Sequence, residues 1–165
     1  MPSGLEASDG GRLSGLAARN GGRLGLAALV AILLLGVGLR LDYAIDGRPP
    51  VYDAKAYARI AAHLEAGDGF TAGRTATQPS SNYSPGLPLL VAGIYALTGG
   101  VNGELARIVL ALIASLAVLF TYLLGRRLGG GAGSPAGVVA GLIGAAAVAA
   151  YPALLEYGGM LMSEP

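Results

Sequence analysis

Two carboxylates that flank apolar segments are the first candidates for chemistry in this sequence. Asp53 precedes an alanine-rich stretch, and Glu164 follows the last apolar segment. The ordinary interpretation of Asp53 is a helix N-cap that accepts hydrogen bonds from the first free amides, although alanine at position 56 leaves no capping box. A partly desolvated carboxylate at a bilayer surface can also act as a general base toward a hydroxyl or an amine. Glu164 is equally well a helix-end carboxylate in water, and Glu156 is the alternative candidate for the acid at this end of the helix.

Basic and aromatic side chains supply candidate partners for an anionic substrate. A cation at the headgroup level is the simplest partner for a lipid phosphate. The substrate- and phosphate-binding candidates are Arg40, Lys55, Tyr57, Arg74, Tyr83 and Arg107, and the further basic residues of the same segment are Arg48 and Arg59. Snorkelling at a membrane edge explains Arg40 and Arg107 equally well.

The residue types present are compatible with a divalent metal cofactor. Carboxylates from two loops can bind a hard divalent cation, because such cations take oxygen ligands. His63, the single histidine, is interpreted as a helix-surface residue and not as a ligand. The absence of cysteine excludes a disulfide framework, a thiolate nucleophile and a cysteine-ligated metal. The sequence also has no nucleotide-binding glycine motif and no Ser/His/Asp arrangement.

The composition is that of a membrane protein. Of the 165 residues, 53% are hydrophobic and 13% are charged, whereas about a quarter of the residues of a soluble domain are charged. The formal net charge of +1 gives no field strong enough to indicate nucleic acid as a partner.

Three apolar runs have the length that a bilayer core requires, roughly 17 to 25 residues. They predict transmembrane helices over 24–41, 105–124 and 136–155. The third run is expected to face another helix through its small residues, namely Gly137, Ala140, Gly141, Gly144 and Ala145. A fourth run, 87–101, is too short to span at about 1.5 Å per residue, so we expect an interfacial helix over about 87–98.

The distribution of arginines sets the expected orientation. Cytoplasmic segments carry an excess of basic residues. This rule assigns to the cytoplasm a disordered tail over 1–23, rich in Gly, Ser and Ala, and the basic turn over 125–135. Segment 42–104 is then external, and it contains an amphipathic helix over about 53–66, where Tyr57, Ile60, Ala61 and Leu64 recur at helical spacing.

The fold class expected from these elements is all-α, a polytopic helical protein of the cell membrane with its candidate site on the external face. Residues 156–165 are placed on the same external side as segment 42–104. The chain is expected to be the N-terminal part of a longer protein and to be inactive alone.

The order of the motifs resembles a known family. The motifs are Tyr52-Asp53-Ala54-Lys55-Ala56-Tyr57, Leu64-Glu65-Ala66-Gly67-Asp68-Gly69-Phe70, Tyr83-Ser84-Pro85-Gly86-Leu87-Pro88-Leu89, Gly125-Arg126-Arg127-Leu128, Ala150-Tyr151-Pro152 and Ser163-Glu164-Pro165. Over roughly residues 24–165 the chain is similar to the N-terminus of the GT-C superfamily of polyprenyl-phosphate-sugar glycosyltransferases, in the bacterial branch of family 39 that includes protein O-mannosyltransferases and aminoarabinose transferases.

The resemblance implies an activity and assigns roles. It implies inverting transfer of a sugar from a polyprenyl-phosphate donor in the membrane to an external acceptor that is a protein, lipid or glycan. Asp53 matches the family's acceptor-activating carboxylate and Glu164 its second acid. The chain departs from the family at Ala54, where the second acid of a pair is common, and at Ala56, where a basic residue is common. The alternative is a non-catalytic membrane protein, a transport or lipid-handling component with structural acids.

Overall fold

The computed structural model describes residues 6–46, 53–131, 134–158 and 160–161, and within these ranges every regular element is a helix. The elements are α1 (Glu6–Ile45), α2 (Asp53–Glu65), α3 (Gly86–Thr98), α4 (Gly103–Leu128), α5 (Pro135–Ala150) and α6 (Pro152–Gly158). The all-α class expected from the sequence is therefore confirmed for the described part of the chain.

Two of the described helices are long and apolar enough to cross a membrane. These are the part of α1 from Gly21 to Ile45 and the whole of α4. A third crossing exists if α5 and α6 count as one span, because these two helices meet at Tyr151 with a bend of 59°. The sequence predicts an unbroken helix over 136–155. The structure breaks it because Pro152 has no amide hydrogen and its ring disfavours a helical conformation at the preceding residue.

The long helix α1 extends further toward the N-terminus than expected. The structure places residues 6–23 in α1, where the sequence predicts a disordered tail. Extension of an existing helix requires no new nucleation, and the leucine, alanine and arginine residues of this stretch are good helix formers. The predicted span over 24–41 thus lies inside a longer helix.

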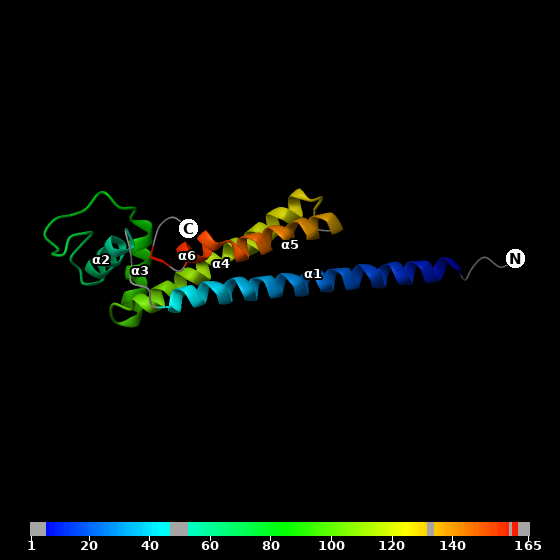
Figure 1. Ribbon diagram of the computed structural model, residues 1–165, viewed down its shortest axis with the longest axis horizontal. Coiled ribbons are helices and arrows are strands. Elements are labelled where there is room, and N and C mark those ends of the chain that lie inside the picture. Colours follow the sequence, from blue (N-terminus) through cyan, green and yellow to red (C-terminus); the bar gives the residue numbers. More distant parts are fainter. Residues whose placement is uncertain (1–5, 47–52, 132–133, 159, 162–165) are drawn as a thin grey trace.

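The helices form a bundle with a small layer at one end. In Figure 1, α4 and α5 lie beside the C-terminal part of α1, the N-terminal part of α1 extends beyond them, and α2 and α3 lie where α1 finishes. One apolar cluster joins α1, α4 and α5 around Leu29, Val118 and Ala145. Large side chains such as Leu34, Phe120 and Ile143 remain exposed on the bundle, as is required of a surface that faces lipid.

The layer of α2 and α3 has its own apolar cluster. The helical spacing expected for α2 buries Tyr57, Ile60 and Ala61, and this helix packs against Val91 and Tyr95 of α3. With 13 residues α3 reaches only about 20 Å, which is short of the ~30 Å core of a bilayer. Its C-terminal Gly99 has a φ of 74°, the left-handed conformation that commonly ends a helix.

Contact between α4 and α5 depends on four glycines. Gly125 of α4 lies one turn before Gly129, the C-cap residue of this helix, and Gly137 and Gly141 of α5 are also one turn apart. A Cβ atom at Gly125 would lie 2.7 Å from the Cα of Gly141, and one at Gly129 would lie 2.7 Å from the Cα of Gly137. Paired small residues at this spacing let membrane helices approach closely and gain van der Waals contact.

The small-residue face expected on the third span is present in part. Gly137, Gly141 and Ala145 are buried, since they follow one another every fourth residue on one face of α5. Gly144 is half-buried, and Ala140 is exposed because it lies on a neighbouring face.

We expect Gly141→Ala to lower the free energy of unfolding by about 1–3 kcal/mol, the usual cost of overpacking. The added Cβ would lie 2.7 Å from the carbonyl oxygen of Tyr122, which belongs to the backbone and cannot rotate away. Thermal unfolding in detergent, followed by circular dichroism, measures the effect. Gly38→Ala is the matched control, because nothing lies within 4 Å of its added Cβ. Equal midpoints for the two variants would contradict glycine-mediated packing.

Candidate functional site

Asp53 lies on the first turn of α2 and is exposed. The amides at a helix N-terminus carry partial positive charge, so they favour a carboxylate at this position. Tyr57 follows one turn later and is buried. Its ring packs edge-on against Tyr83, with ring centroids 5.6 Å apart and an interplanar angle of 73°. The structure thus brings together two predicted substrate-binding tyrosines, one turn along the helix from the predicted base.

The loop from Ala66 to Pro85 is held against α2 by His63. The Nδ1–H of His63 donates to the carbonyl oxygen of Thr71 at 3.0 Å, and the hydroxyl of Thr71 contacts the same nitrogen. The amide of Ser80 donates to the carbonyl oxygen of Phe70 at 2.8 Å and closes the loop. His63 is half-buried, so the histidine that we expected on the helix surface anchors a loop.

This loop contains an open polar hollow that the sequence analysis did not single out. The hollow measures about 310 Å³, and its lining includes Thr75, Thr77, Gln78, Ser81 and Asn82. Hydroxyl and amide groups of this kind form hydrogen bonds with polar ligands. The available signal was the stretch 77–82 between two helices, which is polar except for Pro79. Arg74 is exposed in the same loop, and Lys55 is exposed on α2.

Arg40 occupies the interior of the bundle, with an exposed fraction of 1%. Its Nη1 donates to the carbonyl oxygen of Gly36 at 3.1 Å, and its Nη2 donates to that of Val148 at 3.1 Å. In an unbroken helix the carbonyl of Val148 would accept from residue 152, which is proline. Arg40 therefore satisfies the carbonyl that Pro152 leaves without a donor, and an unpaired carbonyl inside a membrane bundle is costly.

Arg107 likewise donates a hydrogen bond to a helix carbonyl, at the end of α1. Its Nε donates to the carbonyl oxygen of Ala44 at 2.8 Å, and Ala44 belongs to the last turn, whose carbonyls have no partner within the helix. Burial raises the pKa of the nearby Tyr95, while the positive charge of Arg107 acts in the opposite direction. Of the predicted phosphate-binding residues, Arg40 and Arg107 thus bond to helix carbonyls.

The remaining candidates are dispersed. Glu164 and Arg48 lie outside the described residues, and Glu156 is exposed on α6. In the part of the chain that the structure describes, no three histidine, aspartate or glutamate side chains gather to hold a metal ion.

Comparisons with protein-family models, curated proteins and solved structures gave no match to this chain. The proposed activity consequently depends on the sequence motifs and on the arrangement described above.

We expect the effect of Arg40→Met to depend on residue 152. In the Pro152 protein the substitution leaves the carbonyl of Val148 unpaired, which costs about 1–3 kcal/mol. Pro152→Ala restores an amide that can serve this carbonyl, so Arg40→Met should cost less in that background. A double-mutant cycle on unfolding free energies measures the coupling. Arg107→Met, whose carbonyl partner is Ala44, is the control without coupling. Identical costs of Arg40→Met in both backgrounds would refute the assignment.

Proposed function

We propose that this chain forms the acceptor-activating part of a membrane glycosyltransferase, which moves a sugar from a polyprenyl-phosphate donor to an acceptor outside the cell. The supporting observation is the placement of Asp53. It is exposed on the first turn of α2, in the layer that adjoins the end of α1 (Figure 1). A base at such an edge can meet both a lipid-linked donor and a water-soluble acceptor.

In the proposed reaction, Asp53 accepts the proton of the acceptor hydroxyl as its oxygen attacks the anomeric carbon. The bond from this carbon to the phosphate oxygen breaks, and the phosphate leaves as an anion, with inversion at the anomeric carbon. Exposed Lys55 and Arg74 are the proposed cations for this anion. Glu164 is the proposed second acid. A divalent cation is a possible cofactor for the stabilisation of the leaving phosphate.

The sugar is proposed to lie beside the Tyr57–Tyr83 pair. The buried ring of Tyr57 packs edge-on against Tyr83, so the half-buried Tyr83 ring is the one that would present apolar area to the sugar. The polar hollow of the adjoining loop offers hydroxyl and amide groups for the sugar or the acceptor. Arg40 and Arg107 are left out of the proposed phosphate site because their described contacts are with helix carbonyls.

The second candidate is a non-catalytic membrane component. It is favoured by the structural use of Arg40 and Arg107 and by the position of Asp53, where a carboxylate stabilises a helix without any chemistry. The two candidates differ in whether Asp53 affects turnover at an unchanged fold.

We expect Asp53→Asn in the full-length protein to lower sugar transfer from a polyprenyl-linked donor by about 10²–10⁴-fold, the usual contribution of a general base. The amide keeps the size of the side chain but cannot accept the proton. Asp68→Asn, an exposed carboxylate in the turn after α2, is the matched control and should leave transfer unchanged. Full transfer by a folded Asp53→Asn protein would favour the non-catalytic candidate.

The proposed orientation is tested by labelling of single cysteines, since the chain has none of its own. Lys55→Cys on α2 and Arg127→Cys at the end of α4 both replace exposed side chains. In intact cells a membrane-impermeant maleimide should label the first position, and the second only after permeabilisation. The reverse pattern would place Asp53 in the cytoplasm and remove the external acceptor from the proposal.

A further inference from the structure

A groove lies at the opposite end of the bundle, between α1, α4 and α5. Its volume is about 320 Å³, within the usual range of ligand sites, roughly 300–1,000 Å³. Its floor on α1 is made by Gly21, Gly22 and Gly25, which have no side chains to fill it. The apolar walls are Leu26, Leu29, Leu119, Leu123 and Val138.

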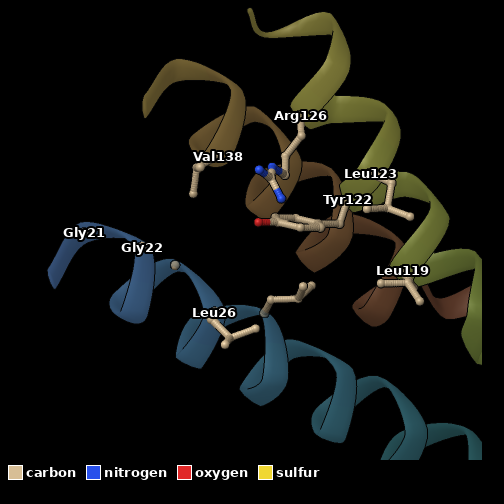
Figure 2. A pocket seen from close by; sticks show the side chains of 10 residues that line it. Gly21, Gly22, Leu26, Leu119, Tyr122, Leu123, Arg126 and Val138 are labelled. Atoms are coloured by element: carbon tan, nitrogen blue, oxygen red, sulfur yellow. The ribbon is translucent and has the colours of Figure 1, made fainter. Parts of the chain in front are cut away.

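The groove has one polar end, formed by Arg126 and Tyr122. The guanidinium carbon of Arg126 lies 5.5 Å from the centroid of the Tyr122 ring, a cation–π contact that fixes the direction of the charge. Figure 2 shows the guanidinium and the Tyr122 hydroxyl lying close together at the gap between α1 and α5. A planar guanidinium recognises phosphate through paired N–H groups, and a neighbouring hydroxyl can add a further hydrogen bond.

The groove lies at one end of the two candidate membrane spans. Arg126 is in the last turn of α4, and Gly21 begins the apolar part of α1. From Arg126 to Leu119 the wall extends roughly 10 Å along the helix axis, from the headgroup level into the acyl region. Leu26 and Leu123 are exposed, so the apolar part of the groove is continuous with the lipid-facing surface.

The charge at this end of the bundle is positive. Arg23 and Arg127 are exposed next to the groove. The segments that form it, 10–41 and 105–155, contain no aspartate or glutamate. An anion is therefore the complementary ligand, and basic pockets between membrane helices do bind anionic headgroups.

We propose that this groove binds one anionic phospholipid of the leaflet that adjoins the α4–α5 turn. The lipid phosphate bonds to the Arg126 guanidinium and the Tyr122 hydroxyl, and an acyl chain lies along the leucine-lined wall. A lipid fits better than free phosphate, because most of the wall is apolar. The site is separate from Asp53 and does not depend on the proposed glycosyl transfer.

The test is native mass spectrometry of the full-length protein released from nanodiscs of mixed phosphatidylglycerol and phosphatidylcholine. The protein should retain phosphatidylglycerol in preference. Arg126→Gln should lower this retention by about fivefold, the effect of one cation near a charged lipid. Arg127→Gln is the matched control, because Arg127 is the next residue but does not line the groove, and it should retain the lipid.

A second variant tests the groove without removing the charge. Gly22→Phe should displace the lipid by filling the groove, since nothing lies within 4 Å of a Cβ atom at this glycine. Gly38→Phe, also on α1 with open space around its Cβ, is the control. Circular dichroism establishes that each variant is folded.

Four results would overturn the proposal. The first is equal retention of lipid by the Arg126→Gln and Arg127→Gln variants, and the second is equal retention of both lipids by the unchanged protein. The third is Arg126-dependent binding of inorganic phosphate without retained phospholipid, which would assign the site to free phosphate. The fourth is protection of Gly22→Cys from a maleimide in lipid-free detergent, because a protein segment would then cover the groove.

Discussion

The bundle depends on one constraint: the carbonyl of Val148 has no hydrogen-bond donor within its own helix. Pro152 ends the hydrogen-bond ladder of α5, and Arg40 of α1 supplies the missing donor at 3.1 Å. A cation inside a membrane bundle is costly unless its donors are satisfied. Here both terminal nitrogens of Arg40 donate to helix carbonyls, while its buried Nε has no hydrogen-bond partner among the described residues. The cost of separating Arg40 from the carbonyl of Val148 holds α1 against α5. A second bond of this kind, from Arg107 of α4 to the carbonyl oxygen of Ala44, joins the end of α1 to the beginning of α4.

The two other helix contacts follow from this arrangement. The α4–α5 pair is held by backbones at van der Waals distance, with glycine facing glycine, so its energy comes from packing and not from exclusion of water. The α2–α3 layer uses larger side chains such as Ile94 and Tyr95, as expected of an amphipathic element that buries its apolar face. The α4–α5 pair is thus held by close backbone packing, and the α2–α3 pair by the burial of larger apolar side chains.

The local elements were predictable, and their tertiary roles were not. The spacing of Tyr57, Ile60 and Ala61 predicts α2, and the apolar runs predict α1 and α4, because these signals are contained in neighbouring residues. The bend at Tyr151 also had a local signal in Pro152, which the length of the apolar run obscured. The role of Arg40 depends on a carbonyl 108 residues away, and the Tyr57–Tyr83 contact depends on how a loop folds back. Neither partner is encoded by periodicity.

The break at Tyr151 has a mechanical consequence. Since Pro152 has no amide hydrogen to donate back to Val148, this backbone bond does not hold α6 in line with α5. The position of α6 is then set by the close approach of Gly158 to Ala114 of α4, and that of the following residues by the burial of Leu161 among the side chains of α2 and α3. Leu161 thereby connects the chain that follows the bend to the α2–α3 layer, so the direction of α6 and the placement of this layer are coupled through one apolar contact.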